Sequence, residues 1–169
     1  MLETEPARAR SRSASLLPAG FHVRGLLLSD LPACAAIMSR SPDLLMEVVR
    51  YPPAECERIL LRSTGPTGRF AADLAGAAVD ASGDICGFAT ANPSGVIGQV
   101  YVLSEHRRRG LGRALVDRAL RGFADRGVER SILTAIAGNQ AALGLYTRLG
   151  FREAYRYPLR FWKAGRKGH

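Results

Sequence analysis

The chain has 169 residues, enough for one domain with an ordinary hydrophobic core. Its residues are 47% hydrophobic and 23% charged, as in typical globular proteins, and no apolar run has the length needed to span a membrane. The formal net charge of +9 comes almost wholly from arginine, because Lys163 and Lys167 are the only lysines, so anionic ligands and nucleic acids have to be considered as partners.

The first segment, residues 1–19, is rich in Arg, Ser and Ala and has no apolar periodicity. We therefore expect a disordered N-terminal tail. The segment has no apolar core of the kind found in signal peptides, which predicts a cytoplasmic location.

Cysteine and histidine give no sign of a metal or redox centre. Cys34, Cys56 and Cys86 are odd in number and scattered, so we expect buried free thiols. The three histidines, at positions 22, 106 and 169, have no ligand spacing, and no metal site is expected.

The first half of the chain alternates apolar runs with turn residues. Ser29 and Asp30 form a helix-capping signal, and Pro32 fits the first turn that follows. The pattern predicts a strand at 21–26, followed by helices at 29–39 and 55–62. A loop at 64–68 and a hairpin of two strands, at 74–79 and 85–91, follow.

The second half of the chain continues with a turn at 92–95 and a strand at 97–103. A helix beginning at Leu111, a strand at 131–136, a helix at 140–149 and two short strands within 151–162 follow. The order predicts an α/β (α+β) domain over residues 20–162, with a mixed sheet and helices on both faces, followed by a basic tail at 163–169.

The end of the 97–103 strand carries the most informative segment. Arg107-x-x-Gly110-x-Gly112 lies between this strand and the next helix, whose first N–H groups have no partner within the helix. The positive end of the helix dipole favours phosphate, and the glycines allow it to approach the backbone. The spacing matches neither a P-loop nor a dinucleotide-binding turn.

This spacing resembles the pyrophosphate loop of the GCN5-related N-acetyltransferase (GNAT) family, which binds acetyl-CoA. A second segment, Asn139-x-x-Ala142-x-x-x-Tyr146-x-x-x-Gly150-Phe151, is similar to another motif of that family. Each of its residues also has a structural explanation: Asn139 as a helix cap, Tyr146 as a packed aromatic and Gly150 as a helix terminator. The two motifs lie one helix and one strand apart, which is the order found in the family.

The resemblance implies a mixed, mostly antiparallel sheet of six or seven strands and an acetyl-CoA-dependent N-acetyltransferase without a metal cofactor. The Val102 backbone would contact the developing oxyanion, and Tyr146 would be the general acid, since a phenol with a pKa of about 10 keeps its proton near neutral pH. The residues implied in cofactor binding are Val100, Tyr101, Val102, Arg107, Arg108, Arg109, Gly110, Leu111, Gly112, Arg113, Asn139 and Tyr146.

The general base is not evident in the sequence. Where relatives carry a catalytic acid, this chain has Thr134 on one strand and Val96, Ile97 and Gln99 on the other. Glu105, Asp43 and Glu47 are the nearby carboxylates, and a solvated surface position is the first interpretation of all three. The alternative for Asp43 and Glu47 is that they receive a cationic amine in the acceptor cleft.

The acceptor is expected to be a primary amine of a small molecule, peptide or protein. Because no base is evident, a non-catalytic, acetyl-CoA-binding regulatory domain is the alternative function. Nucleic-acid binding through the basic surface is the third hypothesis; the chain lacks the aromatic-interleaved basic strands of an RNA-binding protein. Members of this family often form homodimers, and the sequence leaves the oligomeric state open.

Overall fold

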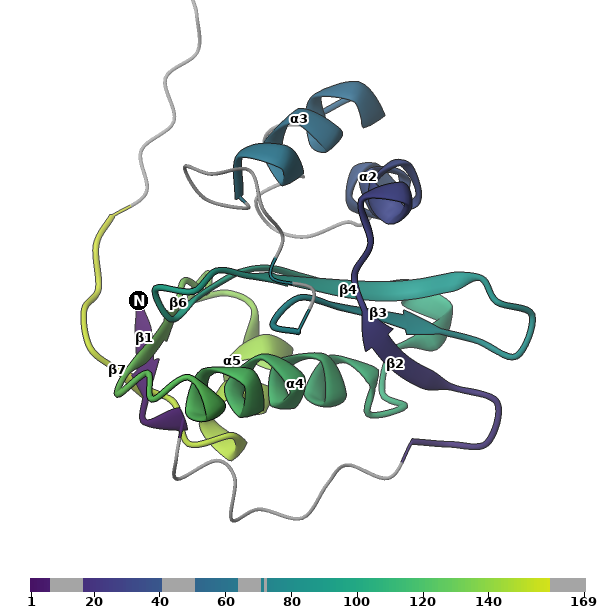
Figure 1. Cartoon of the computed structure of the whole chain (residues 1–169). Coiled ribbons are helices and arrows are strands. Elements are labelled where there is room, and N and C mark those ends of the chain that lie inside the picture. The colour runs from purple at the N-terminus through teal and green to yellow at the C-terminus, as the bar shows by residue number, and fades with distance from the viewer. Residues whose placement is uncertain (7–16, 41–50, 64–70, 72, 159–169) are drawn as a thin grey trace, which may run out of the picture.

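The computed structural model describes residues 1–6, 17–40, 51–63, 71 and 73–158 (Figure 1). The strands are β1 (Leu2–Thr4), β2 (His22–Gly25), β3 (Gly76–Val79), β4 (Ile85–Ala91), β5 (Val96–Val102), β6 (Ser131–Leu133) and β7 (Arg152–Glu153). The helices are α2 (Leu31–Arg40), α3 (Pro53–Ser63), α4 (Leu111–Asp125) and α5 (Gln140–Arg148), with short 3-10 helices η1 (Leu28–Asp30) and η2 (Ser104–His106).

The strands form one sheet in the order β2-β3-β4-β5-β6-β1-β7. Its neighbouring strands are antiparallel except for the parallel pair β5 and β6. Helices α2 and α3 cover one face of the sheet, and α4 and α5 cover the other (Figure 1). The predicted fold class, a mixed and mostly antiparallel sheet between two helical layers, is therefore confirmed.

Each face of the sheet has its own hydrophobic core. Under α2 and α3, residues such as Cys34, Leu60 and Phe88 are fully buried. Under α4 and α5, Leu120 and Phe123 pack with residues from the ends of the sheet. Helix α4 presents these apolar side chains at helical spacing, which is why its predicted position was accurate. None of the described helices is long and apolar enough to cross a bilayer.

The start of the chain differs from the prediction. Residues 1–19 were expected to be a disordered tail, but Leu2–Thr4 form β1, which pairs with β6 on one side and β7 on the other. Leu2 is buried in the core under α4 and α5, and that burial offsets the ordering of three residues that show no periodicity of their own. Residues 7–16 and the predicted tail at 163–169 lie outside the described part of the chain.

Two strand predictions also need correction. The strand expected at 131–136 ends at Leu133, because its partner β5 diverges from it beyond that point. Of the two short strands expected within 151–162, β7 is present at Arg152–Glu153, and residues 159–162 fall outside the described part.

Candidate functional site

An opening in the middle of the sheet defines the candidate site. Strands β5 and β6 pair only at Val96–Ile132 and Ile97–Leu133, after which they separate. A shift in the β4–β5 register between Ala89 and Ala91 marks a bulge at this point. Bulges bend the strand that contains them. Strand β5 therefore turns away from β6, and each strand then leads to one of the two motifs, at 107–112 and 139–151.

The bulge is stabilised by Thr90 and requires a glycine. The Gln99 N–H donates to Thr90 Oγ1 (2.9 Å), replacing a backbone partner, and the Thr90 hydroxyl donates to Gln99 Oε1 (3.1 Å). A Cβ on Gly98 would lie 2.6 Å from Thr90 Oγ1, closer than the side chain could tolerate. These contacts hold the bulge at the point where β5 and β6 separate.

Beyond the bulge, backbone groups of β5 point into the opening. The Leu103 N–H donates to the Cys86 carbonyl of β4 (2.9 Å), and alternate residues of an antiparallel strand face the same neighbour. Tyr101 therefore also faces β4, while Val100 and Val102 direct their N–H and C=O groups away from it. Tyr101 was expected to contact a cofactor through its backbone, but its backbone groups face β4. Its ring stacks on Phe88.

A pocket of about 400 Å³ occupies the point where the two strands separate. Gly98 and Gln99 line it from β5, Leu133 and Thr134 from the β6 side, and Met1 from the start of the chain. None of the described residues lining this pocket is a carboxylate or a histidine. The pocket can accept an extended chain, but it offers no strong base.

The loop from Arg107 to Gly110 has the backbone geometry of an anion site. Arg108 (φ 62°) is the only described non-glycine residue with a positive φ, and Gly110, the N-cap of α4, has a φ of 84°. Left-handed residues at such positions turn successive N–H groups toward one side. A strained arginine conformation of this kind costs on the order of 1–3 kcal/mol and is typical of functional sites.

The first turn of α4 has no side-chain cap. Its first helical hydrogen bond runs from Ala114 N to Gly110 O, so the N–H groups of Leu111, Gly112 and Arg113 have no helical partner. Together with the dipole of a 15-residue helix, they favour a bound anion.

The three arginines of this loop and Arg113 of α4 have different contacts. Arg107 Nε donates to the Val102 carbonyl (3.0 Å) and thereby ties the loop to the end of β5. Arg109 lies over the Phe21 ring, and Arg113 approaches Asp117 at 3.5 Å, a distance too long for a good hydrogen bond. Arg108 is exposed and has no hydrogen-bond or ion-pair partner among the described residues, so its guanidinium is the best placed of the four to reach a ligand.

Helix α5 brings the second motif to the same place. A Cβ on Gly112 would lie 3.5 Å from Leu145 Cδ2 of α5 and 3.8 Å from Val102 Cγ2 of β5, so the three elements meet there. Asn139 is the N-cap of α5 and accepts a hydrogen bond from Ala142 N (3.1 Å). Its side-chain NH₂ group has no described partner and could donate to a ligand.

Tyr146 is largely buried and packs edge-on against Phe151, with ring centroids 5.8 Å apart. Burial raises the pKa of its phenol to about 12. No hydrogen bond joins its hydroxyl to another described residue. Tyr146 therefore combines a packing role with a proton that it keeps at neutral pH.

A family model described as Acetyltransferase (GNAT) family matches residues 43–151, which include both motifs. The chain belongs to the GNAT family. The structure is also similar to that of an Escherichia coli ribosomal-protein-S18-alanine N-acetyltransferase. The two superpose with a TM-score of 0.63 at 27% identity, over 80% of this chain and 79% of the other.

Curated relatives of this GNAT protein match over shorter segments. A mycothiol acetyltransferase of Tsukamurella paurometabola is 39% identical over 54% of this chain and 34% of its own length. An N-alpha-acetyltransferase MAK3 of Arabidopsis thaliana is 40% identical over 37% of this chain and 33% of its own length. The chain thus spans about a third of each of these two relatives.

Glu105, the described residue among the carboxylates considered as a base, does not line the pocket of this GNAT domain. Glu105 lies in η2, is exposed, and accepts a hydrogen bond from the Ser104 hydroxyl (2.9 Å). Asp43 and Glu47 fall outside the described residues. Thr134 and Gln99 line the pocket, as their positions in the sequence suggested, but neither is a base.

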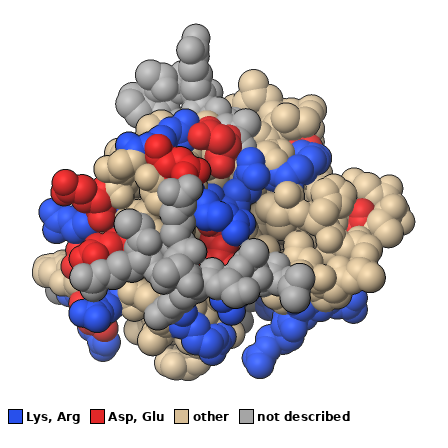
Figure 2. Space-filling view, turned by 60° about the horizontal axis from the view of Figure 1, so that its bottom comes forward, with Lys and Arg blue, Asp and Glu red and all other residues tan. Residues whose placement is uncertain are grey.

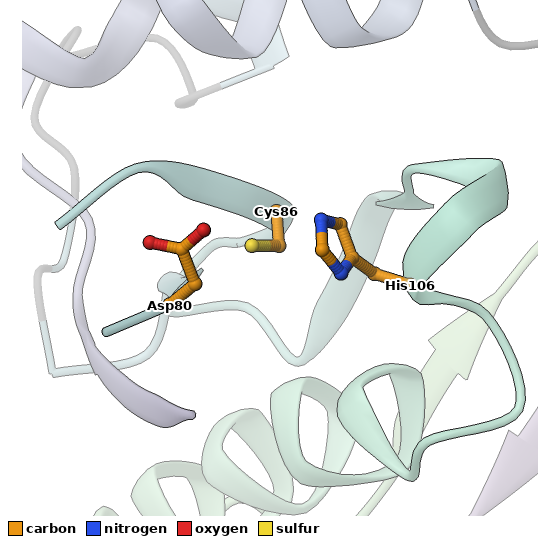
Figure 3. Close-up of side chains that lie close together, drawn as sticks. All are labelled: Asp80, Cys86 and His106. Carbon is orange, nitrogen blue, oxygen red and sulfur yellow. The ribbon is translucent and has the colours of Figure 1, made fainter. Parts of the chain in front are cut away.

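The structure also brings together three residues that the sequence analysis did not connect. Side chains of Asp80, Cys86 and His106 converge at the end of the β3–β4 hairpin (Figure 3), with potential ligand atoms within 4.8 Å of one another. Their separations in the chain are unlike those of metal-binding motifs, so no sequence signal marked them.

Proposed function

We propose that this domain is an acetyl-CoA-dependent N-acetyltransferase that transfers an acetyl group directly to a primary amine of a small molecule, peptide or protein. One observation carries the proposal: β5 leaves β6 after Ile97 and ends at Val102, whose Cγ2 would lie 3.8 Å from a Cβ on Gly112 in the uncapped first turn of α4. An extended thioester arm and its pyrophosphate need these two features side by side. The family uses acetyl-CoA, which supplies the activated acetyl group when bound.

The α4 end of the site would hold the diphosphate. Backbone N–H groups from Arg108 to Arg113 face it, and the Arg108 guanidinium adds a mobile positive charge. Arg107 acts indirectly, since its bond to the Val102 carbonyl fixes the loop relative to β5. Arg109 and Arg113 contribute through the field around the site, as their head groups already contact Phe21 and Asp117.

The β5 edge would position the reacting carbonyl. Val100 and Val102 offer the backbone groups that face the opening, and a fixed N–H donor stabilises an oxygen as it becomes negative. Asn139 can donate to the arm from the start of α5. No charged side chain is needed for this part of the reaction.

Tyr146 would donate a hydrogen bond to the leaving sulfur. Its pKa of about 12 lies above that of a thiol, about 8.5, so full proton transfer from the phenol is uphill. The phenol therefore stabilises the thiolate by a hydrogen bond rather than acting as the general acid expected from the sequence. Solvent receives the proton that the amine nitrogen loses as the amide forms and supplies the proton that completes the thiol. With a pKa of about 12, Tyr146 keeps its proton and remains a donor near neutral pH.

The absence of a base among the described pocket residues favours an acceptor that is partly neutral already. An α-amine has a pKa near 8, whereas a lysine amine has a pKa near 10.4 and is almost fully charged at pH 7. We therefore favour the α-amine of a peptide or a small molecule with a similarly weak amine. Two of the similar proteins, MAK3 and the S18-alanine enzyme, have names that specify such acceptors.

Calorimetric titration with acetyl-CoA tests the cofactor site. Binding is expected in the micromolar range and should be abolished in Gly110→Glu, which strains a φ of 84° and places a carboxylate where the diphosphate should lie. Gly83→Glu is the matched control, because Gly83 has a φ of 89° with open space around it in the β3–β4 turn. Equal binding by both variants, or none by the wild type, would refute the proposed site.

Acetyl transfer is then measured against three acceptor panels: peptides with a free N-terminus, lysine side chains and polyamines. Turnover with the first panel and little with the others is the expected result. The alternative, a regulatory domain that binds acetyl-CoA without chemistry, is favoured only by the missing base. Tight binding without turnover on any panel would support that alternative.

Part of the positive charge is neutralised locally among the described residues. Figure 2 shows arginine side chains interspersed with Asp and Glu on the face in view. Arg24, Arg58, Arg126 and Arg156 each form an ion pair at 2.6–2.8 Å. We therefore do not favour nucleic-acid binding; homodimer formation and a cytoplasmic location stay predictions from the sequence.

A further inference from the structure

We propose that Asp80, Cys86 and His106 form a binding site for one Zn²⁺ ion at the base of the Arg107–Gly110 loop. The three side chains come from three segments: the end of β3, the start of β4 and the last residue of η2. Their potential ligand atoms lie within 4.8 Å of one another. Figure 3 shows the Asp80 carboxylate and the His106 imidazole on either side of the Cys86 sulfur.

A buried nitrogen supports a ligand at this place. His106 Nδ1 is fully enclosed and has no hydrogen-bond partner within the described structure. An imidazole nitrogen in this condition costs free energy unless something occupies it. The His106 ring is held edge-on against Phe21 at 5.5 Å, so it cannot easily turn to solvent.

The carboxylate is already oriented. Asp80 Oδ1 accepts hydrogen bonds from the backbone N–H groups of Ser82 (2.9 Å) and Asp84 (3.0 Å) in the hairpin turn. This leaves its second oxygen for a ligand, as is usual for metal-binding carboxylates fixed by neighbouring donors. The Cys86 thiol lies 3.5 Å from the Asp84 carbonyl and also interacts with the Asp80 side chain.

The donor set selects zinc among the common divalent ions. Sulfur and nitrogen ligands exclude Mg²⁺ and Ca²⁺, which prefer oxygen. Ligand atoms at about 2.0–2.3 Å from a tetrahedral zinc lie roughly 3.5 Å apart, so modest side-chain rotations would close the cluster. One thiolate and one carboxylate balance the charge of the ion, and a water completes the coordination.

Binding exchanges a proton for the metal. A cysteine binds a metal as the thiolate, whereas an ordinary thiol is mostly protonated at neutral pH. Formation of the zinc–sulfur bond displaces this proton to solvent, about one per ion. Because His106 directly precedes Arg107, the ion would also anchor η2 and the start of the anion-binding loop.

Zinc titration of the chelator-treated protein tests the site. We expect one ion per chain with a micromolar or lower dissociation constant, weakened at least about tenfold in Cys86→Ser and His106→Gln. Asp80→Asn should also weaken binding while keeping Oδ1 for the hairpin turn. Cys34→Ser is the control, because Cys34 is an equally buried thiol in α2, far along the chain from the cluster.

A second measurement does not depend on whether the variants fold. Co²⁺ added to the wild-type protein should give a thiolate-to-cobalt charge-transfer band, and Zn²⁺ should remove it. No band together with no zinc uptake would overturn the proposal, as would zinc binding that Cys86→Ser leaves unchanged. Neither measurement requires acetyltransferase activity, so the outcome is independent of the proposed function.

Discussion

Tyr146 combines packing in the hydrophobic core with a proposed role in the reaction. Its ring packs against Phe151 in the core under α4 and α5, and its hydroxyl is the part with no described partner. Tyr146→Phe removes only the oxygen. We expect kcat to fall about 100-fold, with acetyl-CoA affinity and thermal stability close to those of the wild type.

Steady-state kinetics measures the change in kcat, while calorimetry and thermal unfolding measure acetyl-CoA affinity and stability. The pH dependence adds a further check: because burial raises the phenol pKa to about 12, wild-type kcat should show no loss from tyrosine ionisation up to pH 10. Unchanged kcat in Tyr146→Phe would contradict the assigned role and favour the regulatory alternative.

Asp30 is a residue whose role is structural. It is buried, receives a bidentate pair of bonds from Arg24 at 2.6 and 2.9 Å, and accepts from the Leu27 N–H (2.8 Å). The Arg24 guanidinium lowers the pKa of this carboxyl below its usual 3.8. Its stabilising effect is therefore complete above pH 3.8 and is lost as the pH falls through the lowered pKa.

Asp30→Asn should accordingly lower the free energy of unfolding at pH 7 by about 1–2 kcal/mol. The difference from the wild type should shrink as the pH falls below the ordinary Asp range. Chemical denaturation at several pH values measures both the loss at pH 7 and its decrease at low pH. Asp73→Asn is the control, because Asp73 pairs with Arg126 at the surface, where we expect a change of less than about 0.5 kcal/mol.

Among the structural elements, β5 determines whether a site exists. Gly98→Ala would place a Cβ 2.6 Å from Thr90 Oγ1 and disrupt the bond from Gln99 N that holds the bulge. We expect a loss of about 1–3 kcal/mol of stability and weaker acetyl-CoA binding, measured by denaturation and calorimetry.

Gly144→Ala is the control for this change. Gly144 lies in α5, and its added Cβ would meet only Arg148 Nη1 at an ordinary 3.5 Å. Alanine is the better helix former, so this variant should be up to about 1 kcal/mol more stable. Gly98→Ala with wild-type stability and binding would show that the bulge does not set the opening.

The sequence was most informative where a single element carries its own pattern. Helix α4 could be predicted from its apolar spacing, and the glycine loop before it from Gly110 and Gly112. The divergence of β5 from β6 could not be predicted, because it depends on the bond between Thr90 of β4 and Gln99 of β5. The cluster around Cys86 was missed for the same reason: contacts between distant segments leave no local periodicity.

At the scale of the whole molecule, the site lies where the sheet changes from antiparallel to parallel. There the pairing of β5 with β6 stops after Ile97–Leu133, which leaves unpaired backbone groups on β5 inside the sheet. Helices α4 and α5 cover the same face and bring both motifs to this part of the sheet. The layer under α2 and α3 has a separate core and supports the sheet from the other side.

The last strand pair of the sheet depends on the first residues of the chain. Strand β1 lies between β6 and β7, and the Met1 amine donates to the Tyr155 carbonyl (2.6 Å). Leu2 is 8% exposed and packs in the core under α4 and α5. Leu2→Ala should therefore lower the free energy of unfolding by about 2–3 kcal/mol, and hydrogen exchange should quicken at the amides of β6 and β7. Leu28→Ala, at a side chain that is 61% exposed, should change stability by less than about 0.5 kcal/mol. If the two variants were equally stable, β1 would not be part of the folded sheet, and β7 would need another partner.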